Sequence, residues 1–119
     1  MATDPNAAVQ PAAAPQPTIH EAELVPGPSG AVERGTELAF DEAIARRRAG
    51  QDVVVCGADG DANRRLAGQL EAAVGPRTPP QPPEPKAGPQ ALPHFHQASR
   101  DPEGHLFYET DKRKARKKK

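Results

Sequence analysis

The apolar positions of the chain form short patterned stretches between segments rich in proline and glycine. A helix is expected to begin after Ser29 or Thr36 and to end at Arg48, with Gly50 as its stop. Its acidic residues come early and its arginines late, which suits the helix dipole. One broad face of this helix is apolar and predicted to be packed: Val32, Leu38, Ala39, Ala43 and Ile44.

A buried strand and a second helix are predicted in the middle of the chain. The run Asp52–Cys56 is short, apolar and rich in β-branched residues, which is typical of a central strand. Asp61 is the predicted N-cap of a helix over Ala62–Val74, in which a large apolar residue recurs every four positions. Gly75 and Pro76 end this helix.

Two further extended segments are predicted toward the C-terminus. Residues 91–96 favour an extended conformation, and Gly104–Thr110 favours a closing strand. The order is then helix, strand, helix, long loop and strand. This order predicts a small two-layer domain of the α/β or α+β class, with about two helices on a short sheet.

Proline and glycine, at 15 and 10 of 119 residues, indicate the domain organisation. Residues 1–28 are interpreted as a disordered Ala/Pro-rich linker and residues 29–110 as one small α/β domain. Seven prolines in Arg77–Pro93 predict a Pro-rich loop over residues 76–93. Residues 111–119 form a basic tail. With three Phe, one Tyr and no Trp, the core is expected to be small.

The formal net charge of zero hides an asymmetric distribution. Residues 112–119 hold 7 of the 16 Lys and Arg, so residues 1–111 carry 9 positive and 16 negative side chains, a balance of −7. The tail could fold back on the acidic body, or reach outward to nucleic acid or an acidic partner with strongly salt-dependent binding. Its candidate nucleic-acid-binding residues are Lys112, Arg113, Lys114, Arg116, Lys117, Lys118 and Lys119.

The single cysteine and the hydropathy of the chain limit its class. Cys56 alone excludes an internal disulfide, and its place after three valines favours a buried strand residue over a reactive thiol. No stretch has the character of a signal peptide or approaches the length of a membrane span. We therefore expect a cytoplasmic protein, or one delivered by another route or as part of a longer chain.

Three of the four histidines lie close together in the sequence: His94, His96 and His105. On an extended segment His94 and His96 would project to one face, about 6.5–7 Å apart, with Phe95 on the other. That spacing suits two zinc ligands, with His105 and Asp101 or Glu103 completing the set. No second cysteine or H-E-x-x-H helix supports a metal, so no cofactor is expected.

The same histidines suit RNA cleavage without a metal. Attack by the 2′-hydroxyl needs a base to take its proton and an acid to protonate the departing 5′-oxygen, and histidine can do either near neutral pH. His94 or His96 would pair with His105, and Arg100 would hold the phosphate oxygens. Tyr108 would donate a hydrogen bond or stack on a base. The alternative is that these histidines are ordinary surface residues of a Pro-rich loop.

The glycine-containing turn after the predicted strand is a second candidate site. Residues 57–60 precede a helix N-terminus, which can bind an anion. The spacing of Gly57 and Gly60 matches neither a dinucleotide fingerprint nor a P-loop. Asp59 and Asp61 would repel a phosphate unless a divalent cation intervened. An ordinary turn with an Asp cap is the favoured interpretation.

Two segments resemble the C-terminal toxin domains of bacterial polymorphic toxins of the Rhs-repeat kind. They are the aromatic-histidine stretch Ala87–His96 and the Gly104-His105-Leu106-Phe107-Tyr108 element. The resemblance extends over about Val32–Glu109 and includes the Asp52–Gly57 strand. It implies a nuclease at the tip of a long secreted protein, behind a linker such as residues 1–28. The sequence contains no repeats or delivery module, which implies a detached tip or an orphan copy.

The sequence thus supports three functional hypotheses. The first is a bacterial effector domain that cleaves RNA rather than DNA with His94, His96 and His105. Such a domain would act in the target-cell cytoplasm and be bound by a cognate immunity protein. The second is a non-enzymatic module whose basic tail binds nucleic acid or an acidic protein. The third is a structural or regulatory fragment of a larger assembly.

Overall fold

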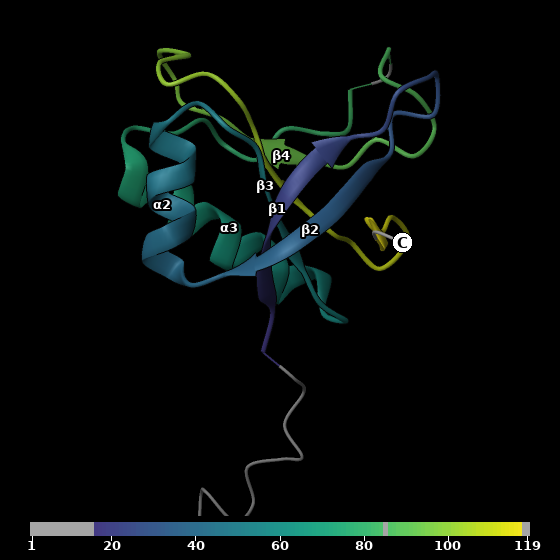
Figure 1. The fold of residues 1–119 in the computed structure, drawn as a ribbon, viewed down its shortest axis with the longest axis horizontal. Helices are drawn as coiled ribbons and strands as arrows, with labels where there is room; N and C mark the ends of the chain where they lie inside the picture. The colour runs from purple at the N-terminus through teal and green to yellow at the C-terminus, as the bar shows by residue number, and fades with distance from the viewer. Residues whose placement is uncertain (1–15, 85, 118–119) are drawn as a thin grey trace, which may run out of the picture.

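The computed structural model describes residues 16–84 and 86–117, which form a six-stranded mixed sheet and two helices (Figure 1). The strands follow the order β4-β5-β3-β1-β2-β6 across the sheet. β3 and β5 are parallel, as are β2 and β6, and the other neighbours are antiparallel. The elements are β1 (Thr18–Leu24), β2 (Val32–Leu38), α2 (Phe40–Arg48), β3 (Val53–Cys56), α3 (Gly60–Val74), β4 (His94–Phe95), β5 (Leu106–Tyr108) and β6 (Arg116–Lys117).

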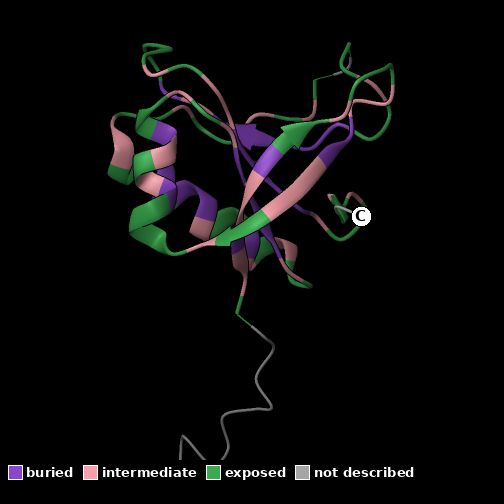
Figure 2. Ribbon diagram, viewed as in Figure 1, coloured by how far each residue is buried: buried purple, intermediate pink, exposed green. Residues whose placement is uncertain are grey.

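Both helices pack on one face of the sheet, and this layer contains the main core. Figure 2 shows the buried positions concentrated in the central strands and on the inward sides of α2 and α3. This arrangement confirms a two-layer domain, and the mixed sheet places it in the α+β class. The buried side chains of this core are Ile19, Ala43, Val53, Val55, Ala67, Leu70, Phe95, Leu106 and Tyr108.

The opposite face of the sheet is covered by segments that lack helices. A second buried cluster joins Val54, Cys56 and Phe107 of the central strands to Leu92 of the Pro-rich segment. Ala115 of the basic tail packs against the same cluster. The central strand β3, predicted from the sequence, is therefore buried on both faces, and all four of its residues are buried.

The first part of the fold differs from the sequence-based prediction. β1 lies within the predicted linker, and β2 occupies most of the segment expected to begin the first helix. β1 pairs with β2 on one side and β3 on the other, so backbone hydrogen bonds of the sheet override the helical pattern of residues 32–38. The helix begins only at Phe40, later than predicted, and its end at Arg48 is as predicted. Residues 1–15 of the expected linker lie outside the described residues.

The start of α3 also differs from the prediction by two residues. Asp59, rather than Asp61, is the N-cap, because its carboxylate accepts hydrogen bonds from the amides of Asp61 and Ala62 at 3.0 and 3.2 Å. Residues 57–60 are thus a turn with an aspartate cap, as favoured from the sequence. The predicted end is confirmed, since the helix ends at Val74 and Gly75 is its C-cap.

The described part of the basic tail folds back on the body of the protein. Arg116 and Lys117 form β6, which pairs with β2 at the sheet edge. The amide of Ala115 donates to the buried Glu109 carboxylate at 2.8 Å, and the Arg113 guanidinium donates to the Ala91 carbonyl at 2.7 Å. Of the two arrangements left open by the sequence, this segment adopts the first.

Candidate active site

Three imidazole rings from two separate stretches of chain converge at one edge of the sheet. The ring centroids of His94 and His105 are 4.8 Å apart, with the rings nearly perpendicular. His96 completes the group, with centroids 5.9 Å from His94 and 6.1 Å from His105. The predicted convergence of these residues is therefore present, and we call the three side chains the histidine cluster.

Strand pairing positions the histidine cluster. β4 runs antiparallel to β5 with Phe95 opposite Leu106, which places His96 across from His105. Phe95 points into the helix-side core, so His94 and His96 share the other face, as the alternation of a strand predicts. These short strands are held by the parallel pairing of β5 with the buried β3.

Asp52 is a member of this site that the sequence did not single out. Because β3 and β5 are parallel with Val53 opposite Leu106, the residues that precede both strands meet at the same edge. The Asp52 carboxylate accepts the His105 backbone amide at 2.8 Å and lies 3.9 Å from Nδ1 of the His105 ring. The sequence did show a carboxylate directly before a buried strand. That this carboxylate contacts His105 depends on the strand order, which the sequence did not reveal.

Two members of the histidine cluster, His94 and His105, border a cavity of about 270 Å³. Arg100, the candidate phosphate-binding residue of the sequence analysis, lines it together with His94 and His105. Arg100 has φ of +67°, a conformation that is uncommon for a residue other than glycine. The remaining lining combines apolar walls with one carboxylate: Leu24, Gly30, Glu84, Ala87, Ala91, Leu92 and Phe107.

The cavity rim is formed where the β1–β2 loop meets the Pro-rich segment. The amide of Gln90 donates to the Ser29 carbonyl at 2.8 Å. Gly30 and Gly88 both have positive φ, and a Cβ on either would collide with the backbone of the other segment. The β1–β2 loop and the Pro-rich segment therefore pack backbone against backbone at this rim, although neither is helix or strand there.

His94 is the most enclosed member of the histidine cluster. It is only 9% exposed, and its Nδ1 makes no hydrogen bond of good geometry within the described residues. Burial lowers the pKa of His94, and the nearby His105 and His96 lower it further, against smaller opposing effects of the Leu92 backbone and the Glu84 carboxylate. At neutral pH the ring is therefore neutral and able to accept a proton.

His105 differs from His94 because it has a carboxylate beside it. Burial lowers its pKa, and Asp52 acts in the opposite direction, while His96, Arg100 and Arg47 add to the lowering. His96 is more open, and its Nδ1 lies 2.9 Å from the Gln97 carbonyl, to which it donates. The rings thus have distinct surroundings, which is what separate acid and base roles require.

Tyr108 is not part of this site, contrary to the sequence-based assignment. Along β5 the side chains alternate, so Phe107 faces the cavity while Tyr108 packs in the helix-side core against Phe95. Tyr108 lines a different pocket with Arg64, and burial raises its pKa. The period of two along a strand makes it impossible for both neighbours to reach one cavity.

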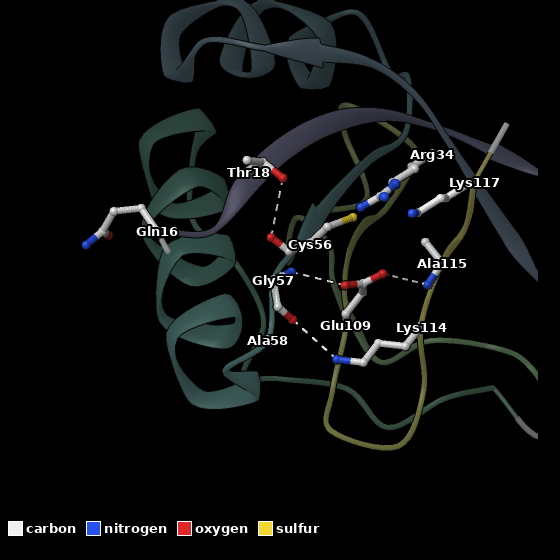
Figure 3. A pocket seen from close by; sticks show the side chains of 10 residues that line it. All are labelled: Gln16, Thr18, Arg34, Cys56, Gly57, Ala58, Glu109, Lys114, Ala115 and Lys117. Carbon is white, nitrogen blue, oxygen red and sulfur yellow. Dashed lines mark hydrogen bonds between the residues drawn. The ribbon is translucent and has the colours of Figure 1, made fainter. Parts of the chain in front are cut away.

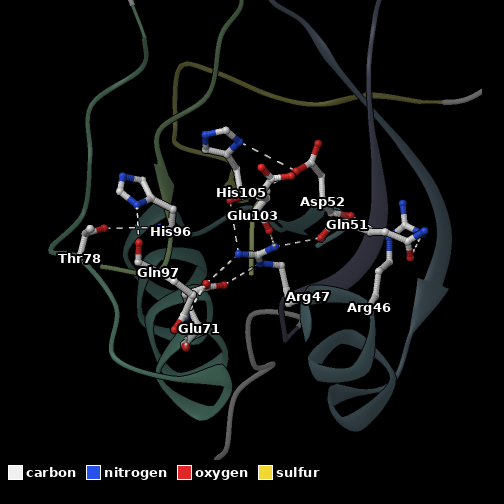
Figure 4. A network of polar contacts seen from close by, with 11 residues as sticks. Arg46, Arg47, Gln51, Asp52, Glu71, Thr78, His96, Gln97, Glu103 and His105 are labelled. Atoms are coloured by element: carbon white, nitrogen blue, oxygen red, sulfur yellow. Dashed lines mark hydrogen bonds and ion pairs between the residues drawn. The ribbon is translucent and has the colours of Figure 1, made fainter. Parts of the chain in front are cut away.

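A buried ion pair connects both histidine-bearing segments to the helices (Figure 4). Arg47 of α2 and Glu71 of α3 are fully buried and form two hydrogen bonds of 2.8 Å each. Arg47 also donates to the Glu103 carbonyl at 2.7 Å, just before His105. Gln97, just after His96, donates to the Glu71 carboxylate at 2.7 Å. This network fixes the loop between the two segments.

The predicted nucleic-acid-binding residues of the tail do not all project freely. The side chains of Arg113 and Lys114 donate to backbone carbonyls, and Arg116 donates to the Gln90 side chain at 2.9 Å. Lys112 and Lys117 are exposed. Lys118 and Lys119 lie outside the described residues.

Two further expectations concern metals and membranes. Among the described side chains, no group of three or more His, Cys, Asp or Glu residues is arranged to hold a metal ion. The zinc set considered from the sequence is therefore not assembled there. Over residues 16–84 and 86–117, neither helix has the length and apolar character needed to span a bilayer.

No family model matches the chain, and the comparisons with curated proteins and with solved structures give no significant match. The resemblance to polymorphic toxin domains therefore stays a prediction.

Proposed function

We propose that the protein is a ribonuclease that cleaves RNA with His94 and His105 as base and acid, without a metal. The observation that carries this proposal is the convergence of these two rings at a cavity that Arg100 also lines. Two groups that exchange protons near neutral pH beside one cation are what transesterification of a phosphodiester needs.

The chemical roles follow from the surroundings of each ring. His94, neutral and enclosed, accepts the proton of the 2′-hydroxyl while the 2′-oxygen attacks phosphorus. The bond from phosphorus to the 5′-oxygen breaks, and the 5′-oxygen takes a proton from His105, whose protonated form is stabilised by Asp52. The products are a 2′,3′-cyclic phosphate and a free 5′-hydroxyl. Arg100 would stabilise the charge that develops on the phosphate oxygens.

The deciding experiment is cleavage of single-stranded RNA by purified protein in the presence of a chelator. Wild-type protein should yield cyclic-phosphate ends, while His105→Ala and His94→Ala should lower kcat/KM by at least about 100-fold, the range of general acid–base effects. His20→Ala is the matched control, because His20 bonds to Thr18 and Gly35 within β1 and β2, outside the cluster. Equal activity of His105→Ala and wild type would refute the proposal.

We further propose that this ribonuclease is an effector domain of the polymorphic-toxin kind, delivered by a larger protein and neutralised by a cognate immunity protein. Only the sequence resemblance supports this part. It requires that production of wild-type protein in a bacterial cytoplasm degrades total RNA and stops growth, and that the triple histidine variant does neither. Growth arrest by both proteins would contradict it, and RNA binding without cleavage would favour the binding-module alternative.

A further inference from the structure

A second cavity lies on the same face of the sheet as the histidine cluster but at the other end of β3 (Figure 3). Its volume is about 410 Å³, and Cys56 and Gly57, at the C-terminal end of β3, form part of its wall. Thr18 of β1 and Arg34 of β2 line it from one side, and the tail residues Lys114 and Lys117 line it from the other.

Two cations meet at this cavity without an acidic partner. The parallel ladder of β2 and β6 places Arg34 directly opposite Lys117, and Figure 3 shows both charged groups beside Cys56. Like charges in direct opposition across a sheet are unfavourable. Within the described residues, no carboxylate lies within ion-pair distance of either one. The neighbouring register pair, Glu33 with Arg116, has opposite charges.

One carboxylate, that of Glu109, also lines the cavity, and its charge offsets only one of the positive charges there. Both oxygens of Glu109 are already engaged, by the amide of Gly57 at 3.0 Å and that of Ala115 at 2.8 Å. Burial, together with the Glu109 charge, raises the pKa of the Cys56 thiol to about 12, so the thiol is uncharged. Lys114 adds a third positive charge at the rim, where it donates to the Gly57 carbonyl. Arg34, Lys114 and Lys117 against Glu109 give the lining of the cavity a formal net charge of +2.

We propose that this cavity binds a phosphate group of the RNA backbone other than the one that is cleaved. The planar guanidinium of Arg34 offers two parallel N–H donors to phosphate oxygens, and Lys117 supplies a second charge. The site rests on the proposed ribonuclease function for its biological ligand. Its chemistry, an oxyanion site between two cations, stands on the geometry of β2 and β6 alone.

The distance between the two sites defines the substrates that can use both. Asp52, beside His105, directly precedes β3, and Cys56 is four residues further along the chain, which corresponds to about 13 Å of extended strand. A dinucleoside monophosphate has only the scissile phosphate and cannot occupy the second cavity. Longer RNA can place a further phosphate there, so the second cavity should matter only for longer substrates.

Binding is tested first by adding inorganic phosphate to the protein. The amide resonances of Gly57 and Ala115 are monitored by NMR during this titration. Both resonances should shift and saturate in wild type and in the control Arg48→Gln/Arg65→Gln, which removes two exposed arginines of α2 and α3. Arg34→Gln/Lys117→Gln should lose these shifts or weaken binding at least tenfold. If it does not fold, Lys117→Gln at the exposed sheet edge replaces it. Shifts unchanged by these variants would overturn the site.

Cleavage and salt dependence then connect the site to RNA. Arg34→Gln/Lys117→Gln should lower kcat/KM at least tenfold on a ten-nucleotide RNA and leave that on a dinucleoside monophosphate unchanged. Because one phosphate contact is lost, the slope of log affinity against log salt for the uncleavable 2′-deoxy oligomer should fall by about 0.7 in magnitude. An equal loss on both substrates, or none on the long one, would refute the RNA role. If phosphate shifts the Gly57 and Ala115 amide resonances of wild type but wild type cleaves no RNA, the ribonuclease proposal is refuted and the anion site is supported.

Discussion

At the scale of single residues, the two histidines at the cavity have similar positions and different neighbours. His94 has a buried Nδ1 without a hydrogen bond of good geometry, whereas His105 has a carboxylate 3.9 Å from its Nδ1. Burial lowers the pKa of both rings from 6.5. Asp52 makes the protonated form of His105 more stable than it would otherwise be. In the proposed mechanism, this difference makes His94 the base and His105 the acid.

The pH–rate profile tests this assignment. Because both pKa values are lowered, the bell-shaped profile of kcat/KM should have its maximum below pH 6.5. Asp52→Asn keeps an acceptor for the His105 amide but removes the charge, which lowers the pKa of His105 further. The alkaline limb should therefore move to lower pH. Asp61→Asn, on the exposed start of α3, should leave the profile in place. Movement of the acid limb to lower pH, with the alkaline limb in place, would instead make His105 the base and reverse the roles.

The stability of the fold should respond to the same burial of His94. Its folded pKa lies below its unfolded value, so the unfolded state binds more protons once the pH falls below about 6.5. The contribution of His94 to stability is thus fully present above that pH and is lost toward lower pH. The free energy of unfolding should change through this group by at most about 1.4 kcal/mol per pH unit. Urea denaturation of wild type and His94→Gln from pH 7.5 to 5.5 should show a flatter dependence in the variant; parallel curves would contradict this.

At the scale of elements, a buried ion pair decides how the two histidine-bearing segments are held. Arg47 and Glu71 are fully buried, and each also bonds to the segment between His96 and His105. A buried pair can be neutral for stability relative to apolar residues, but removing one partner leaves an uncompensated charge. The pair therefore positions the loop as well as joining α2 to α3.

Removal of either partner should be costly. Glu71→Gln leaves the Arg47 guanidinium buried without a counter-charge, so the free energy of unfolding should fall by about 3–5 kcal/mol. Arg47→Lys should not restore the wild-type value, because an ammonium cannot reproduce the two parallel bonds to Glu71. Arg48→Lys on the exposed side of α2 is the control and should change stability by less than about 0.5 kcal/mol. Urea denaturation measures all three; a small loss in Glu71→Gln would mean that water reaches the pair.

At the scale of the whole molecule, the basic tail belongs to the fold as well as to the charge distribution. Residues 111–117 cover the helix-free face, pair with β2 and contact the Pro-rich segment that leads to His94. Through these contacts the tail stabilises the face of the sheet that carries both cavities.

Truncation distinguishes a tail that stabilises the fold from one that only contributes positive charge. Deletion of residues 112–119 removes the Ala115 donor to buried Glu109 and the Arg113 contact with Ala91, and should lower the free energy of unfolding by about 1–3 kcal/mol. Deletion of Lys118 and Lys119 alone removes charge but none of these contacts, and should leave the midpoint of urea denaturation unchanged. If both deletions leave stability unchanged, the tail only contributes positive charge.

The sequence by itself determined the elements whose signals are local. Four features were predictable from the sequence: the valine run of β3, the end of α2 at Arg48, the end of α3 and the extended histidine segment. They were predictable because the spacing of apolar residues and the cap residues depend only on neighbours in the chain. It also identified His94, His96, His105 and Arg100, which lie together.

Only the tertiary structure decided the rest, because it depends on which strands pair. Residues 32–38 become a strand through hydrogen bonds to β1 and β6, which no local pattern encodes. Parallel pairing brings Asp52 to His105, and alternation along β5 excludes Tyr108 from the cavity. The pairing of Arg34 with Lys117 arises from residues far apart in sequence. Long-range pairing is set by the whole sheet at once, whereas a sequence read in windows carries only the preferences of each segment.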